Sequence, residues 1–109
     1  MSESKADILQ ELYTVIESRK SADPESSYTA QLLGKGREKI ACKFAEEAIE
    51  VVLAGVHESP DRLASESADV LYHLMVLWVA AGVEPTDVWE ALEKRRGTSG
   101  IAEKQSRSV

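Results

Sequence analysis

The sequence is poor in residues that break helices or crosslink chains. Its 109 residues include three prolines, six glycines and one cysteine, Cys42. A single cysteine excludes a disulfide within the chain and favours a reducing compartment, so we expect a cytoplasmic protein. No apolar run approaches the roughly 20 residues of a membrane span, and the N-terminus lacks the apolar segment of a secretory signal. We therefore expect no membrane association.

An excess of positive charge is also missing, because the formal net charge is -6. General nucleic-acid binders are usually basic, so we expect no nucleic-acid partner. An acidic protein that handles phosphates must overcome charge repulsion with a metal ion or with a few well-placed lysines and arginines.

Strand-like alternation is absent, and the few glycines and prolines separate segments of helical periodicity. The sequence predicts an all-α fold, a compact bundle of about five helices in one domain over 1–109. We expect helices at 6–20, at 26–33 with Gly34 as its stop, at 37–56, from a Ser59 cap and Pro60 to Gly82, and at 85–95. A polar tail from about residue 97 is expected to be mobile.

The fourth predicted helix is apolar on nearly every side from Leu71 to Val79. A helix that is apolar all round must be covered all round, which is difficult in a monomer of this size. The sequence therefore predicts a homodimer that associates through apolar helices.

Five acidic residues lie on the third and fourth predicted helices. Glu46, Glu47 and Glu50 share one helix, and Glu66 and Asp69 lie near the start of the next. Residues three or four apart share a helix face, and a short connection makes the two helices antiparallel neighbours. The carboxylates can then converge, which would be costly without a cation. All-oxygen ligands favour Mg²⁺, Mn²⁺ or Ca²⁺ over zinc, and Mg²⁺ commonly binds substrate phosphates as well. A solvated acidic face is the competing interpretation.

Basic residues continue the same stripe and gather near the C-terminus. Lys39 and Lys43 precede Glu46 by about two turns and one turn, so they either form ion pairs on the helix or bind substrate phosphates. Arg95, Lys104 and Arg107 are the other candidates for phosphate binding, although cations such as Arg95 also suit a helix C-terminus.

Three other features are assigned no chemistry. His73 lies in an apolar helix, where a histidine is more often a hydrogen-bonded core or interface residue than a ligand. Cys42 has no base placed beside it in the sequence. The segment Gly34-Lys35-Gly36 lacks the longer pattern of a phosphate-binding loop and is better interpreted as a turn.

The chain resembles the phosphoribosyl-ATP pyrophosphatases in three segments: residues 39–50 (KIACKFAEEAIE), 66–73 (ESADVLYH) and 96–104 (RGTSGIAEK). The paired acidic motif is shared with the wider all-α nucleoside triphosphate pyrophosphatases, including MazG-like and dimeric dUTPase-like enzymes. The Tyr72-His73 pair and the C-terminal segment narrow the resemblance to the histidine pathway.

The resemblance implies Mg²⁺-dependent hydrolysis of phosphoribosyl-ATP to phosphoribosyl-AMP and pyrophosphate, the second step of histidine biosynthesis, by a helical dimer. Carried over by position, the metal ligands are Glu47, Glu50, Glu66 and Asp69. Glu46 and Glu47 are the catalytic candidates, and Glu46 either binds a second metal or orients the attacking water. Two alternatives remain: a housekeeping pyrophosphatase acting on another nucleoside triphosphate, and a non-catalytic helical module that binds a partner through its acidic face.

Overall fold

The computed structural model describes residues 7–96, 100, 104, 105 and 107. Over these residues it consists of helices and their connections, without strands. The elements are α1 (Asp7–Ser18), a short 3-10 turn η1 (Arg19–Ser21), α2 (Tyr28–Lys35), α3 (Arg37–His57), α4 (Pro60–Ala81) and α5 (Pro85–Arg96). The prediction of an all-α fold with five helices is confirmed. Most of the tail that we expected to be mobile lies outside the described residues.

Local capping chemistry sets most of the helix ends. The Ser27 side chain accepts a hydrogen bond from the backbone N–H of Ala30 and starts α2. The Ser59 side chain does the same for the N–H of Arg62 and starts α4. Gly82 closes α4 in the left-handed region, at φ +76°.

The predicted stop at Gly34 is wrong by two residues. Helix α2 continues to Lys35, and Gly36 ends it with a φ of +91°. Gly36 is also the residue that precedes α3, so a single glycine makes the whole turn between two helices. A side chain at this φ would be strained, which is why the break falls at Gly36.

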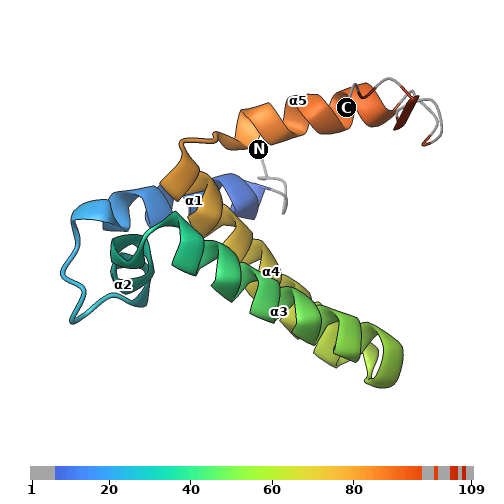
Figure 1. Cartoon of the computed structure of the whole chain (residues 1–109), viewed down its shortest axis with the longest axis horizontal. Coiled ribbons are helices and arrows are strands. Elements are labelled where there is room, and N and C mark those ends of the chain that lie inside the picture. The colour runs from blue at the N-terminus through green and yellow to red at the C-terminus, as the bar shows by residue number, and fades with distance from the viewer. Residues whose placement is uncertain (1–6, 97–99, 101–103, 106, 108–109) are drawn as a thin grey trace, which may run out of the picture.

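Helices α3 and α4 form a long antiparallel hairpin that dominates the packing of the chain. Figure 1 shows α1 and α2 packed at one end of this hairpin, while its other end projects away from them. The buried core lies at the covered end and consists of Tyr13, Ile16, Leu32, Ile40, Met75, Val76 and Val79. The covered end therefore holds the hydrophobic core of the single chain.

The projecting end leaves apolar side chains exposed. On α3 these are Ile49, Val52, Leu53 and Val56, and α4 adds Leu71. Only some of the apolar side chains of α3 are therefore buried, since Ile40 is fully covered and Val52 is 61% exposed.

Helix α5 leaves α4 at a sharp bend and runs along the far side of the molecule from the α3–α4 turn (Figure 1). Its main aromatic contact is an edge-to-face pair of Trp78 and Trp89, with ring centroids 6.2 Å apart. The radius of gyration is 16.0 Å, against about 13 Å for a compact domain of this length. This larger value reflects the projecting hairpin and α5, which extend from the covered end of the bundle (Figure 1).

No individual helix among the described residues has the length and hydropathy of a membrane span. Helices α4 and α5 reach these limits only when taken together across their 114° bend.

Candidate metal centre

Three carboxylates from two helices converge in the projecting half of the hairpin. Oxygens of Glu47 on α3 and of Glu66 and Asp69 on α4 all lie within 4.8 Å of one another. Glu66 and Asp69 share a face because they are three residues apart, and the short connection between α3 and α4 brings that face against Glu47. We call these three residues the carboxylate triad.

The spacing of the triad fits one small divalent cation. Opposite oxygens around Mg²⁺ are about 4.2 Å apart, twice a bond of about 2.1 Å, and adjacent ones are closer. Three oxygens within 4.8 Å of one another reach such an arrangement through small side-chain rotations. The donors are all carboxylate oxygens, the set that Mg²⁺, Mn²⁺ and Ca²⁺ prefer. The residues present therefore fit a hard divalent cation.

Burial adds to the repulsion within the triad. The Glu66 side chain is only 11% exposed and that of Glu47 only 18%. Carboxylates in such surroundings are costly to keep charged unless a cation is close.

Two cations of the chain partly neutralise the triad. The Lys43 Nζ lies 3.7 Å from Glu47 Oε1, and the Arg62 Nη2 lies 3.0 Å from Glu66 Oε1. No ion pair of Asp69 occurs among the described residues. Three carboxylates and two cations leave a formal charge of -1, so a bound divalent cation would bring the cluster to +1.

Arg62 was not identified from the sequence. Its guanidinium bridges Glu58, at 3.2 Å from Nε to Oε1, and Glu66. These two hydrogen-bonded carboxylates raise the pKa of Arg62, chiefly through the Glu58 bond. The available signal was its spacing, because Arg62 stands four residues from each acid: Glu66 lies on the same helix, and Glu58 lies in the connection just before it.

The other two predicted acids lie outside the triad. The Glu46 side chain is 68% exposed, and its Oε1 lies 3.8 Å from Lys43 Nζ, so it borders the triad from the solvent side. Glu50 is exposed and is not part of the group of converging oxygens. Its charge is nevertheless felt by Arg62 on the neighbouring helix.

The predicted substrate-binding cations divide into two sets. Lys39 and Lys43 line a groove of about 450 Å³ between α2 and α3 that reaches Glu46. Arg95 lies at the C-terminal end of α5, which diverges from the projecting hairpin and ends well apart from it (Figure 1), so one chain does not bring it to the triad. Lys104 and Arg107 are exposed positions beyond α5, next to residues outside the described part.

A hydrogen-bonded histidine fixes the backbone at Asp69. His73 is buried, and its Nδ1 lies 2.7 Å from the carbonyl oxygen of Asp69. A carbonyl only accepts, so Nδ1 carries the hydrogen and the Nε2 of the neutral ring can accept from the Tyr28 hydroxyl, 3.4 Å away. The expectation of a hydrogen-bonded core histidine is confirmed.

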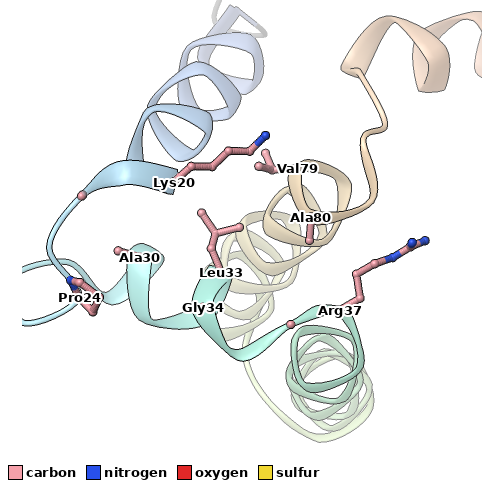
Figure 2. Close-up of a pocket in the computed structure, with 10 residues that line it drawn as sticks. Lys20, Pro24, Ala30, Leu33, Gly34, Arg37, Val79 and Ala80 are labelled. Atoms are coloured by element: carbon pink, nitrogen blue, oxygen red, sulfur yellow. The ribbon is translucent and has the colours of Figure 1, made fainter.

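A second pocket, of about 430 Å³, opens on the opposite side of α2 (Figure 2). Lys20 and Arg37 lie at its rim with Leu33 between them, and its floor includes Val79 and Ala80. None of its described lining residues is acidic. It is therefore separate from the carboxylate triad.

Comparisons with known proteins agree with this geometry. The family model for phosphoribosyl-ATP pyrophosphohydrolase matches residues 9–96. The chain is 61% identical over 101 residues to the phosphoribosyl-ATP pyrophosphatase of Paramagnetospirillum magneticum, covering 93% of each chain. It is 56% identical over 109 residues to that of Azospirillum brasilense, covering 98% of each, and 57% identical over 101 residues to that of Rhodospirillum rubrum, covering 93% of this chain and 86% of the relative. The chain belongs to the phosphoribosyl-ATP pyrophosphohydrolase family.

Proposed function

We propose that this chain hydrolyses the α–β phosphoanhydride of phosphoribosyl-ATP and releases phosphoribosyl-AMP and pyrophosphate. The reaction is the second step of histidine biosynthesis, and we assign it to the cytoplasm. The observation that carries the proposal is the convergence of the carboxylate triad, Glu47, Glu66 and Asp69, from two helices. Membership of the family supports the choice of substrate.

We assign Mg²⁺ as the cofactor, held by the triad together with Glu50. Bound there, it would neutralise charge on the phosphate oxygens and lower the pKa of a coordinated water. Glu50 stands one turn from Glu47 on the same helix, which is why it stays a predicted ligand although its oxygens are outside the triad.

Glu46 is the residue best placed to take a proton from the attacking water. It adjoins the ligand Glu47, faces solvent, and is held near the site by Lys43. A carboxylate within hydrogen-bond reach of the water can act as general base. Because Glu46 is outside the triad, this role would take no ligand away from the metal. Glu47, the other catalytic candidate, is better used as a ligand because its oxygen already belongs to the triad.

The substrate is a small nucleotide, bound through its phosphates by Lys39 and Lys43. Arg95, Lys104 and Arg107 are proposed to contribute phosphate contacts from the C-terminal segment. Because α5 diverges from the hairpin of its own chain and ends well apart from it (Figure 1), these contacts are most easily made across a subunit boundary.

We propose a homodimer because it allows these contacts across a subunit boundary. A second reason is the exposed apolar side chains of α3. Ile49, Val52, Leu53 and Val56 repeat at helical spacing on α3 and are exposed in the single chain. Apolar residues at this spacing form the contact between packed helices, and the same residues of a second copy can pack against them. Sedimentation equilibrium tests this: a dimer is expected, and Leu53→Glu should shift it toward the monomer.

The decisive test of the activity is pyrophosphate release from phosphoribosyl-ATP, with Mg²⁺ and with EDTA, beside a panel of nucleoside triphosphates. We expect turnover of phosphoribosyl-ATP that requires the metal. Preference for a free triphosphate would instead support the housekeeping alternative, and no metal-dependent release from any substrate would support the non-catalytic one.

A further inference from the structure

The groove between α2 and α3 carries a cationic track that starts at the metal centre. Three lysines line it: Lys43 and Lys39 on α3 and Lys35 at the end of α2. Lys43 connects the track to the triad through its ion pair with Glu47. Lys39 follows one helical turn away, about 6 Å along the axis.

Lys35 joins this track because of the turn at Gly36. The glycine's φ of +91° lets α2 and α3 meet with a single residue between them. Lys35, the last residue of α2, thereby lines the same groove as Lys39, which follows it four positions later in the sequence. A lysine at the C-terminus of α2 also interacts favourably with the helix dipole, but that role does not require Lys35 to line the groove.

Two of the three lysines of the track have no ion pair within the described part of the chain, although Glu46 also lines the groove. Lys43 has acidic partners, whereas no ion pair of Lys35 or Lys39 occurs among the described residues. Three lysines in one groove repel one another, in a protein whose overall charge is -6. The groove is thus suited to an anion with several charges.

An aromatic wall bounds the groove on the α2 side. The Tyr28 side chain lines it and is 49% exposed, while Leu32 forms a buried floor. The Tyr28 hydroxyl faces His73 Nε2, and its ring stacks near Tyr72, with centroids 6.4 Å apart. These contacts hold the wall in place against α4, so the width of the groove is set by packed residues.

We propose that this groove binds the pyrophosphate end of the substrate, with Lys35 as a further phosphate-binding residue at the far end of the track. The scissile bond then lies at the carboxylates, and the leaving group extends along Lys43, Lys39 and Lys35. The proposal rests on the proposed function for the identity of the substrate. The lysines would recognise a terminal phosphate. The substrate has a second one, the 5'-phosphate of the phosphoribosyl group.

The test measures binding of inorganic pyrophosphate and of ribose 5-phosphate by calorimetry with Mg²⁺ present. Lys35→Met should weaken pyrophosphate binding about tenfold, the loss of a charge-assisted hydrogen bond. Lys35→Arg should restore most of it. Lys20→Met is the matched control, since Lys20 is an exposed cation beside the pocket on the other side of α2 and should leave the affinity unchanged.

Two results of the calorimetry overturn the proposal. One is an equal effect of Lys35→Met and Lys20→Met on pyrophosphate. The other is a Lys35-dependent site that takes ribose 5-phosphate in preference to pyrophosphate. Neither measurement needs turnover. If phosphoribosyl-ATP is not hydrolysed but Lys35→Met still weakens pyrophosphate binding, the proposed function fails and the groove assignment stands.

The single cysteine locates the bound ligand. Cys42 is exposed and lines the same groove, and it is the only thiol in the chain. Pyrophosphate should slow its reaction with the anionic disulfide reagent DTNB several-fold, and Lys35→Met should need about tenfold more pyrophosphate for the same protection. An unchanged rate of Cys42 modification would place the pyrophosphate elsewhere and overturn the proposal.

Discussion

The two ends of the α3–α4 hairpin are built for different purposes. At the end covered by α1 and α2, the hairpin buries Ile40, Met75, Val76 and Val79 in the core. At the projecting end, the same two helices have only each other, and they hold the carboxylate triad beside exposed apolar residues. The difference teaches that one chain completes its own packing at one end of the hairpin and leaves the carboxylate triad at the other, between two helices alone. The candidate site is placed on the part that a single chain leaves uncovered.

The largest expected effect concerns the projecting end. Asp69→Asn should reduce pyrophosphate release at least about 1000-fold, or about 4 kcal/mol in the barrier, because it removes a charged ligand from the triad. The melting temperature should stay the same or rise, since repulsion within the triad falls. Glu90→Gln, an exposed acid on α5, is the control and should keep full activity. Retained activity in Asp69→Asn would contradict the assigned metal site.

The second prediction contrasts isoleucines at the two ends. Ile40→Ala should lower the free energy of unfolding by about 2–5 kcal/mol, because Ile40 is fully buried in the core. Ile49→Ala should change it by less than about 0.5 kcal/mol in dilute protein, because Ile49 is 59% exposed in the single chain. Urea unfolding over a range of protein concentrations measures both. An effect of Ile49→Ala that grows with concentration would show a second copy covering the projecting end.

The third prediction concerns alkaline pH at the covered end. Burial raises the pKa of Tyr13 and of Tyr72, with nearby Glu84 adding to the effect at Tyr13. Above about pH 10 the unfolded chain loses these protons first, so stability should fall as pH rises further and be unaffected near neutrality. Tyr13→Phe should reduce this alkaline loss. It should also cost about 1 kcal/mol at pH 7, because the Tyr13 hydroxyl donates to the Val83 carbonyl at 2.8 Å.

The smallest expected effects are at the α2–α3 turn and have opposite signs. Gly36→Ala should destabilise by about 1 kcal/mol, because Gly36 has a φ of +91°. Gly34→Ala should stabilise by about 0.5–1 kcal/mol, because Gly34 lies inside α2 with nothing near its added carbon. Thermal unfolding of the two variants compares them directly. Equal shifts in the same direction would contradict the assigned position of the turn.

Local signals in the sequence predicted the helices well, because their ends depend on nearby residues. Ser59, Pro60 and Gly82 mark α4 correctly, and each acts within a few positions of the end it sets. Which of the two glycines, Gly34 or Gly36, ends α2 was harder to predict from the sequence. Both glycines allow a helix to end, and only the packing of α2 against α3 decides which one takes the positive φ.

The candidate site was predictable in part. Spacing alone indicated that Glu66 and Asp69 face one way and that an antiparallel neighbour brings acids of the third helix to them. Whether Glu47 or Glu50 meets α4 more closely depends on the rotation of α3 about its axis, which tertiary packing sets. Lys35 was overlooked because it belongs to a different helix from Lys39, although the four-residue spacing across Gly36 was visible in the sequence.

The contact between Trp78 and Trp89 gives the molecule a built-in optical reporter. These are the only tryptophans in the sequence, and their rings meet edge to face across the bend between α4 and α5. The tryptophan fluorescence of the protein therefore originates at this one junction. Emission intensity and wavelength will follow the docking of α5, the helix that carries Arg95, without any added dye and independently of the chemistry at the carboxylates.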